Sequence, residues 1–250
     1  MTRSLSESPL RFSAAIFDFD ETIVNLEPQH NAAAEALCRE SGSDYLDMPE
    51  DFRNSSGRRV VDEVAEMRRF FGWQCSTADL YERRQNLFLE ACRSTDIVPM
   101  TGAIHVVRTL HDRGLRLGIA SSGIRQSIEE ILALLGLREL FTAIVAGEQV
   151  ERGKPDPETY LTTAGLLALR PGDCLVFEDS SVGVAAAQSA GMFCVAVRNP
   201  HAQIRQDLSA ANMEVQSFEE LDLDALLDPS MDDGPAVKAG DTLTDPGGAA

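Results

Sequence analysis

Short strand-like runs alternate with amphipathic stretches along most of the chain, and this alternation limits the fold more than any other feature. Helical periods run over segments such as 103–113 and 124–135, where apolar residues recur every three or four positions. Strands that alternate with helices pair in parallel, because each helix returns the chain to the same end of the sheet. We therefore predict an α/β fold with a doubly wound parallel sheet. The strand-like runs occupy residues 14–17, 115–120, 143–146, 174–177 and 193–197.

One long segment, 27–98, interrupts the alternation. It contains no strand-like run, and turn residues at 99–102 lead back into the alternating pattern. We predict an α-helical domain at 27–98, inserted into a parallel-sheet core formed by 13–26 and 99–227. The expected helical periods of the insert are 31–40, 59–71 and 78–93.

The two ends of the chain differ in composition from the rest. Residues 228–250 include five Asp, one Lys and seven Gly or Pro, with almost no apolar side chains to bury. Ser, Arg and Pro are frequent among the first eleven residues. We expect a disordered N-terminal tail at 1–12 and a disordered acidic C-terminal tail at 228–250.

The charge of the chain excludes several classes of partner. With 22 Lys and Arg against 40 Asp and Glu, the formal net charge is −18, which repels nucleic acids and anionic membranes. No run of 18 apolar residues is present, and the five cysteines are scattered without a C-x-x-C spacing. We expect a cytoplasmic monomer or small homo-oligomer that acts on a small molecule, with no nucleic acid or membrane partner.

Acidic residues stand directly after two of the strand-like runs. Asp18 and Asp20 follow run 14–17, and Glu178 and Asp179 follow run 174–177. Ligands bind at the carboxyl ends of strands in open α/β sheets, so these acids are candidate site residues. Each pair also has a structural explanation, as a solvated turn for the first and a helix N-cap for the second.

Three further polar residues occupy comparable places. Ser121 and Ser122 follow run 115–120 ahead of an expected helix N-terminus, which suits a phosphate oxygen, although a helix cap is the simpler reading. Lys154 lies in the turn-rich stretch 152–157, which can hold one cation in a fixed position, whereas a surface lysine is the alternative. Together the strand-end residues supply a nucleophile, an acid, hydroxyl groups, a cation and metal ligands.

This combination is suited to phosphoryl transfer. Asp18 can attack phosphorus to form an aspartyl-phosphate, while Asp20, two residues on, gives and then takes a proton. A magnesium ion on Asp18 would keep that carboxylate ionised, and so leave proton transfer to Asp20.

The spacing of these motifs resembles the haloacid dehalogenase superfamily of phosphohydrolases, over roughly residues 14–227. The helical insert is similar to that of the branch with β-phosphoglucomutase, phosphoglycolate phosphatase and sugar-phosphate phosphatases. The resemblance implies a Rossmann-like core whose insert is a cap over the site. It implies that Asp18 is the nucleophile and a magnesium ligand, and that Asp20 is the acid/base and a ligand through its backbone carbonyl. It further implies that Asp179 and Glu178 are metal carboxylates, and that Ser121, with Ser122 beside it, and Lys154 hold the phosphoryl oxygens.

The chain departs from this family at several positions. Many relatives carry Gly at the place of Glu21 and Asp-Ser at that of residues 25–26. Thr22 matches the phosphatases, where the mutases carry Val, and His30 matches a histidine near the mutase acid/base. A mutase cap presents a basic residue at a position that aligns here with Val60, and a small shift of register would place Arg58 or Arg59 there.

Three functions follow from these observations. The first is a magnesium-dependent phosphatase for a small phosphorylated metabolite of the sugar or polyol class, which Thr22 and Val60 favour. The second is a phosphosugar mutase similar to β-phosphoglucomutase. The third, a signalling receiver domain, also combines an acceptor Asp, a hydroxyl residue and a Lys, but it needs neither Asp20 nor a helical insert.

Overall fold

The computed structural model describes residues 10–53, 58–202, 205–230 and 237–238. Most of the two expected tails therefore lies outside the described residues. The sheet packing already includes Phe12, a residue of the expected N-terminal tail, whose exposed fraction is 4%. Beside it the Arg11 N–H donates a hydrogen bond to the Leu227 carbonyl at 3.0 Å, so the start and the end of the core lie side by side.

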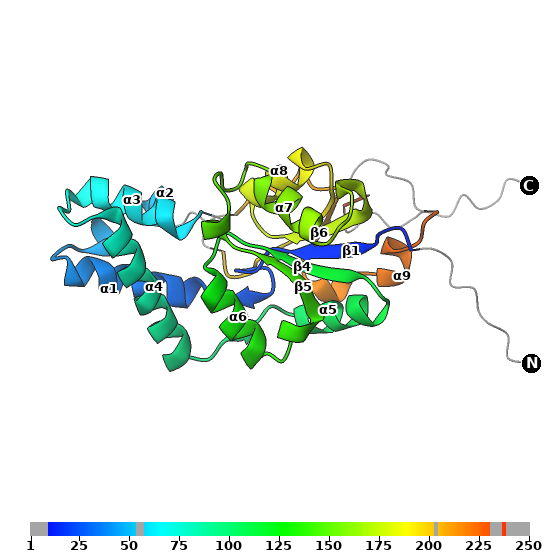
Figure 1. The fold of residues 1–250 in the computed structure, drawn as a ribbon, viewed down its shortest axis with the longest axis horizontal. Coiled ribbons are helices and arrows are strands. Elements are labelled where there is room, and N and C mark those ends of the chain that lie inside the picture. Colours follow the sequence, from blue (N-terminus) through cyan, green and yellow to red (C-terminus); the bar gives the residue numbers. More distant parts are fainter. Residues whose placement is uncertain (1–9, 54–57, 203–204, 231–236, 239–250) are drawn as a thin grey trace, which may run out of the picture.

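A parallel sheet forms the core, as the alternating pattern predicted (Figure 1). Its strand order within the described residues is β5-β4-β1-β6-β7-β8-β9, and every neighbouring pair is parallel. Strands β1 and β7 have the bounds expected from the sequence. The strands are β1 (Ala14–Phe17), β4 (Arg116–Ala120), β5 (Phe141–Val145), β6 (Cys174–Glu178), β7 (Phe193–Val197), β8 (Met213–Val215) and β9 (Val237–Lys238).

Helices cover both faces of this sheet (Figure 1). Helices α5 (Ala103–Asp112) and α6 (Arg125–Leu134) pack on one face, and α7 (Glu158–Leu166) and α8 (Ser181–Ser189) on the other. Alternate residues of β1 serve the two layers, since Phe17 packs with the α5 and α6 side and Ile16 with the α7 and α8 side. A strand buried on both faces reads as a continuous apolar run, which is why β1 is visible in the sequence.

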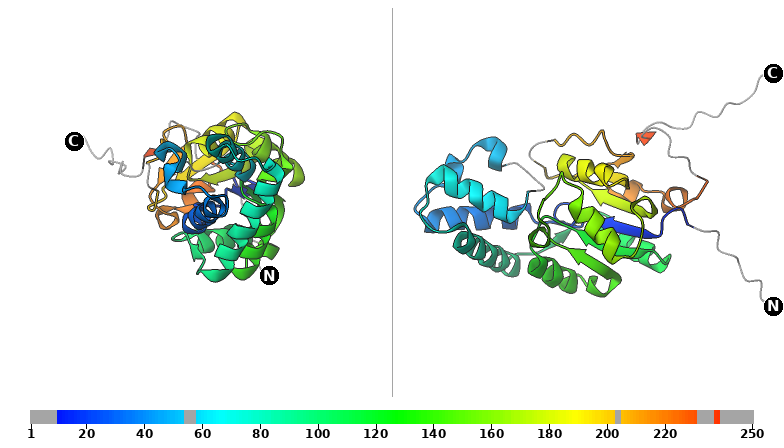
Figure 2. Two further views of the ribbon diagram at one scale, coloured as in Figure 1. Left: turned by 90° about the vertical axis from the view of Figure 1, so that its left-hand side faces the viewer. Right: turned by 45° about the horizontal axis from the view of Figure 1, so that its top comes forward.

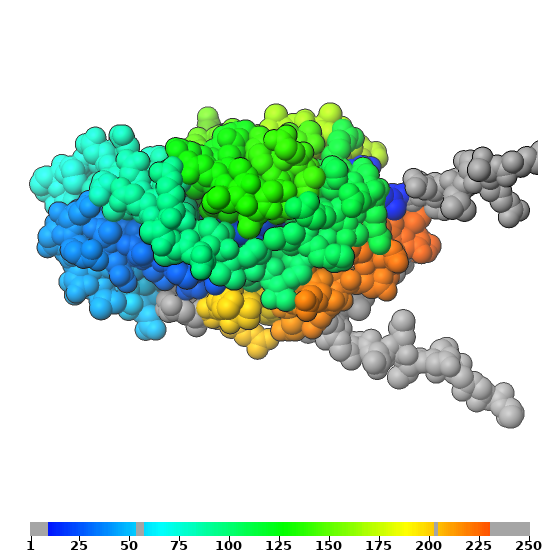
Figure 3. Space-filling model, turned by 90° about the horizontal axis from the view of Figure 1, so that it is seen from below, coloured from blue at the N-terminus to red at the C-terminus, as the bar shows by residue number. Residues whose placement is uncertain are grey.

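Helices of the insert cap one end of the sheet (Figures 1 and 2), and four α-helices lie in its described residues. They are α1 (Glu27–Glu40), α2 (Glu50–Arg53), α3 (Val60–Phe71) and α4 (Thr77–Ser94). The chain enters and leaves the cap through an antiparallel pair of two-residue strands, β2 (Val24–Asn25) and β3 (Val98–Pro99). The space-filling view in Figure 3 shows the cap surface running directly into that of the core.

The remaining elements are short. Helix α9 (Leu223–Leu226) follows β8, and 3₁₀ turns lie at Tyr45–Asp47, Arg138–Leu140, Gly147–Gln149, Pro171–Asp173 and Phe218–Glu220. None of the helices in the described ranges has the length and apolar composition that a membrane span requires.

The strand order places a crevice at the centre of the sheet. From β1 the chain builds outward to β4 and β5, and then crosses back to the other side of β1 with β6, β7 and β8. The order reverses between β1 and β6, and ligands of doubly wound sheets bind outside the carboxyl ends of the strands at such a point. Asp18 and Asp179 follow these two strands.

Candidate active site

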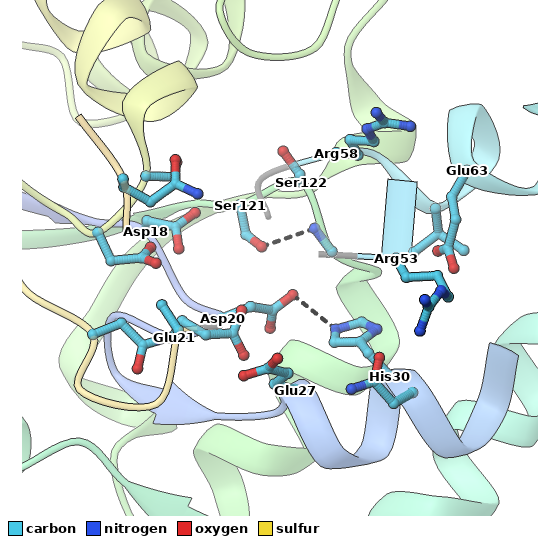
Figure 4. Close-up of a pocket in the computed structure, with 18 of the residues that line it drawn as sticks. Asp18, Asp20, Glu21, Glu27, His30, Arg53, Arg58, Glu63, Ser121 and Ser122 are labelled. Carbon is cyan, nitrogen blue, oxygen red and sulfur yellow. Dashed lines mark hydrogen bonds and ion pairs between the residues drawn. The ribbon is translucent and has the colours of Figure 1, made fainter. Parts of the chain in front are cut away.

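The acids after β1 and β6 meet above the sheet. The Asp18 N–H donates to the Phe177 carbonyl at 3.0 Å, which fixes the end of β1 against β6. Asp18 and Asp179 are almost fully buried, with exposed fractions of 7% and 4%. Both line a cavity between core and cap, together with Asp20 (Figure 4). The structure thus brings together three of the carboxylates that the sequence singled out.

Lys154 neutralises part of the negative charge of these carboxylates. Its Nζ lies 2.6 Å from Asp18 Oδ1 and 2.5 Å from Glu178 Oε1, and the side chain is 1% exposed. Burial opposes the charged form of this lysine, but Asp18 and Glu178 outweigh it and raise the Lys154 pKa. The lysine is therefore a fixed cation beside Asp18.

Glu178 is turned away from the cavity, and its oxygens are occupied. Oε1 accepts hydrogen bonds from Lys154 and from the Tyr160 hydroxyl at 2.8 Å. Oε2 accepts from the Asp179 N–H, the Ser180 N–H and the Ser180 hydroxyl, each at 3.0 Å. Burial raises the pKa of Glu178, but Lys154 and these donors outweigh burial and lower it overall. Glu178 therefore holds Lys154 in position and does not line the cavity. The sequence had grouped it with the carboxylates that do.

Asp20 contacts the first helix of the cap. Its Oδ2 lies 3.2 Å from His30 Nε2 (Figure 4). The imidazole stacks on the Phe88 ring, with the ring centroids 4.2 Å apart. Arg84 Nη2 lies 3.4 Å from His30 Nδ1 and donates to the His30 carbonyl at 3.1 Å. A guanidinium can only donate, so this contact favours the tautomer in which Nδ1 accepts and Nε2–H points to Asp20, although the same Nη2 also lies 3.4 Å from both Glu63 carboxylate oxygens.

The serines after β4 form another wall of the cavity. Ser121 is 1% exposed, and its hydroxyl accepts a hydrogen bond from the Gly123 N–H at 2.9 Å. A Cβ at Gly123 would lie 3.1 Å from both Asp20 Oδ2 and Ser121 Oγ, so glycine lets this turn approach the two side chains closely. Ser122 lines the same cavity.

The cavity carboxylates repel one another. Burial, followed by the nearby carboxylates and against the pull of Lys154, raises the Asp18 pKa to about 8. Burial, with Glu178 and Asp18 next, raises the Asp179 pKa well above its usual range. The Thr22 hydroxyl donates a hydrogen bond to Asp179 Oδ1 at 3.2 Å. The set has more negative charge than Lys154 balances.

This donor set fits a magnesium ion. Mg²⁺ prefers oxygen ligands, and proteins bind it through one or two carboxylates while water and phosphate oxygens complete its shell. Asp18 and Asp179 supply two such carboxylates, and their raised pKa values show that the pocket favours an added cation. Within the described residues no three His, Cys, Asp or Glu side chains already form a closed metal cluster. An ion here would thus have most of its shell open to substrate and water.

Glu21 occupies a strained backbone position. Its φ is +62°, the left-handed region that favours glycine, which accounts for the Gly of many relatives at this place. Its Oε1 accepts a hydrogen bond from the Leu26 N–H at 3.1 Å, and Leu26 is the N-cap of α1. Burial and then Asp20 raise the Glu21 pKa well above its usual range. The carboxyl thus ties the turn after β1 to the entry of the cap.

The cap presents both cations and carboxylates to the cavity. Arg53, Arg58 and Glu63 face the aspartates across it (Figure 4), and Val60 lines it as well. Val60, which aligns with the basic position of a mutase cap, lines the cavity, and so does Arg58 two residues earlier, as the alternative register allowed. Arg59 is not a lining residue.

Some lining residues carried no signal that the sequence alone could reveal. Arg84 is 1% exposed and lines the cavity from the middle of α4, where a helical arginine reads as a surface residue. Its Nε and Nη1 have no hydrogen-bond partner within the described residues. From the core, Asn199 and Gln206 also line the cavity, and Gln206 accepts from the Ser181 hydroxyl at 2.9 Å.

Known proteins are similar to this chain in sequence and in fold. A family model described as haloacid dehalogenase-like hydrolase matches residues 15–197. Validoxylamine A 7'-phosphate phosphatase of Streptomyces hygroscopicus subsp. limoneus is 31% identical over 76% of this chain and 87% of its own length. Fructose-1-phosphate phosphatase of Escherichia coli K12 is 34% identical over 75% of this chain and 97% of its own length.

A solved structure agrees at the level of the fold. β-Phosphoglucomutase of Clostridium difficile superposes with a TM-score of 0.74 at 24% identity, over 86% of this chain and 95% of that chain. The family match spans most of the chain, and the strand-end acids lie within it. The chain belongs to the haloacid dehalogenase-like hydrolase family.

Proposed function

We propose that this protein is a magnesium-dependent phosphatase that hydrolyses the phosphate monoester of a sugar or polyol through an aspartyl-phosphate. The observation that carries the proposal is the placement of Asp18. Its carboxylate is almost fully buried, lies 2.6 Å from the Lys154 ammonium, and lines the cavity between core and cap together with Asp179. A carboxylate fixed in this way can approach a phosphorus atom whose charge the cation offsets.

Asp18 and Asp20 divide the chemistry. An Asp18 oxygen forms a bond to phosphorus as the bond from phosphorus to the ester oxygen breaks, and Asp20 gives its proton to the departing alcohol. Water then attacks the phosphorus, Asp20 takes a proton from it, and the bond to Asp18 breaks to release inorganic phosphate. His30 Nε2–H, at 3.2 Å from Asp20 Oδ2, orients that carboxyl for both transfers.

A bound magnesium ion supplies positive charge that neutralises substrate oxygens and keeps Asp18 ionised. Asp18, Asp179 and the Asp20 backbone carbonyl are the groups of this chain that would hold it. Glu178 acts differently from the expected metal ligand, because its five hydrogen bonds keep it under Lys154. Ser121, Ser122 and Lys154 would hold the phosphoryl oxygens.

The cap side of the cavity suits a polyhydroxylated leaving group. Hydroxyl groups both donate and accept, and the cap offers acceptors on Glu63 and donors on Arg53 and Arg58. The two relatives described above are named as phosphatases of validoxylamine A 7'-phosphate and of fructose 1-phosphate, and the second of these, a sugar phosphate, supports the same class. Thr22, bound to Asp179, agrees with the phosphatase pattern.

A phosphosugar mutase is the second candidate, because Arg53 and Arg58 line the cap side of the cavity. A mutase must hold a second phosphate with such a cation and keep water away from the aspartyl-phosphate. His30 near Asp20 is compatible with this reaction as well.

A turnover screen separates the two functions. Sugar, polyol and glycolate phosphates would be supplied with Mg²⁺, with and without a hexose bisphosphate activator, and both inorganic phosphate and isomerised sugar phosphate would be measured. We expect phosphate release from several monoesters. Formation of glucose 6-phosphate from β-glucose 1-phosphate faster than phosphate release would establish the mutase instead, and no turnover of any ester would refute both.

A further inference from the structure

The cap residue Arg59 is hydrogen-bonded to the core loop that leads to Lys154. Its Nη1 donates to the Val150 carbonyl at 3.1 Å and to the Glu151 carbonyl at 3.0 Å. Arg59 is the N-cap of α3, so these bonds join the start of a cap helix to residues just before the buried lysine. The side chain is only 17% exposed.

Two glycines of the core make room for this side chain. A Cβ at Gly153 would lie 2.8 Å from Arg59 Cδ and 2.9 Å from Cγ and Nε. At Gly147 it would lie 3.3 Å from Arg59 Cγ and collide with the Ser122 carbonyl. Arg59 therefore lies directly on the loop 147–153, and Lys154 is the next residue along the chain.

The same loop is tied to the serine turn of the site. The Gly147 N–H donates to the Gly123 carbonyl at 2.9 Å. Gly123 in turn donates to the Ser121 hydroxyl at 2.9 Å. Hydrogen bonds thus connect the loop under Arg59 to Ser121, one of the groups proposed to hold the phosphoryl oxygens.

Arg59 has little capacity left to bind a substrate. Its Nε and Nη2 bond the two oxygens of Asp62 at 2.7 and 3.1 Å, so Asp62 and the two carbonyls take four of its five N–H donors. It does not line the cavity, whereas Arg58 does. Asp62 holds the guanidinium plane in the orientation that meets the loop carbonyls.

We propose that Arg59 is a positioning residue, which fixes the loop 147–153 while the cap is seated and so holds Lys154 against Asp18. The proposal rests on the phosphatase function proposed above, in which Lys154 binds the transferred phosphoryl group. Two hydrogen bonds and the packing on Gly153 are lost when the cap moves off the core. The cation beside the nucleophile is then held less firmly, so seating of the cap and completion of the site are one event.

Two variants test this from the two sides of the contact. Arg59→Met keeps the aliphatic stem but removes the donors, and Gly153→Ala pushes the stem off the loop from the core. Arg69→Met is the matched control, since it removes the same charge from an exposed site on the same helix, α3. Hydrogen exchange of the backbone amides in 147–153, measured by mass spectrometry without substrate or metal, reports on the loop independently of turnover.

We expect the amides of 147–153 to exchange faster in Arg59→Met and Gly153→Ala than in the wild type. In Arg69→Met they should exchange at the wild-type rate. With Mg²⁺ and p-nitrophenyl phosphate, the first two variants should lose on the order of 10-fold to 10²-fold in kcat, as for misplacement of a catalytic group, with little change in KM. Arg59→Lys should restore part of the kcat.

Three results would overturn the proposal. Unchanged exchange in Arg59→Met would show that the contact does not order the loop. Faster exchange with unaltered kcat would show that the loop does not position Lys154. A rise in KM with unchanged kcat would make Arg59 a substrate-binding residue. If the wild type released no phosphate from any ester, the phosphatase function would fail and the role of Lys154 with it, but the exchange data would still show whether Arg59 orders the loop.

Discussion

Asp18 must meet two requirements that conflict when no metal ion is bound. A nucleophile must be ionised, yet burial raises the pKa of Asp18 to about 8 even beside Lys154. The neighbouring carboxylates of Glu178 and Asp20 add to that rise. The residue is therefore prepared to receive a cation, which would favour its charged form.

Replacement of Asp18 by Asn should abolish turnover and leave the fold intact. The amide is close in shape to the carboxylate but can neither attack phosphorus nor neutralise a metal ion. Phosphate release and circular dichroism would be measured together. Activity within about tenfold of the wild type would contradict the assignment of the nucleophile.

The raised pKa of Asp18 also predicts how stability depends on pH when no metal is bound. The folded protein keeps a proton on Asp18 up to about pH 8, whereas the unfolded chain releases it near the usual value of 3.8. The contribution of Asp18 to the free energy of unfolding is complete below the pKa that Asp18 has in the unfolded chain. It is lost as the pH rises through the pKa of Asp18 in the folded protein. The free energy of unfolding in chelator should fall between about pH 4 and pH 8, as followed by urea titration.

The control for this experiment is Asp18→Asn, which cannot titrate. Its stability should fall less steeply over the same range, although the raised pKa of Asp179 leaves it some slope. Equal slopes in the two proteins would show that Asp18 has no raised pKa.

At the level of elements, β6 and α8 act together to place Lys154. Glu178 ends β6, and the first turn of α8 packs onto its carboxylate through Gly183. A Cβ at Gly183 would lie only 1.7 Å from Glu178 Oε1, the oxygen that holds Lys154. The helix can approach the strand end this closely because the residue is glycine.

Gly183→Ala should therefore displace Glu178 and unseat Lys154. We expect a loss of about 1–3 kcal/mol in the free energy of unfolding, as for an overpacked core, together with a lower kcat. Gly165→Ala in α7 is the matched control, because a Cβ there meets nothing within 4 Å. That control should keep its activity and gain up to about 1 kcal/mol from helix propensity. Thermal melts and phosphate release would distinguish the two variants.

The sequence predicted those elements whose burial leaves a pattern. Strands β1 and β7 and the three long stretches of cap helix were visible, because apolar residues recur at the right period. Strands β2, β3, β8 and β9 were missed, and β9 lies in the expected C-terminal tail. Two or three residues show no period, and β8 has a single buried residue, Val215. These strands exist because neighbouring elements hold them in place, which no local pattern reports.

For the candidate site, the sequence indicated the strand ends but not the direction of every side chain. Asp18 and Asp179 lie where strand ends predicted, and Glu178 was grouped with them. Val176 and Phe177 pack on opposite faces of the sheet, so alternation turns Glu178 to the face of Val176, where Tyr160 lies. Arg84 could not be predicted, because its burial depends on how the cap packs over the core.

On the scale of the whole molecule, a bound metal ion should stabilise the folded state. Binding to the folded state alone stabilises it by about 2.7 kcal/mol at a concentration of 100 Kd. We expect Mg²⁺ to raise the melting temperature of the wild type and to leave that of Asp179→Asn almost unchanged. Calorimetry with and without chelator would measure this, and equal shifts in both proteins would place the ion elsewhere.

The central position of β1 also has a consequence for synthesis of the protein. Ala14 pairs with Arg116 of β4 and with Cys174 of β6, so both partners of this apolar strand are encoded far downstream. In the sequence the cap lies between β1 and β4, and its helices α1 and α4 pack on each other within one continuous stretch of chain. On the ribosome the cap can thus fold while β1 still has no neighbours. We expect the nascent chain to carry an exposed aggregation-prone segment until β6 has emerged, and to depend on chaperones during that interval.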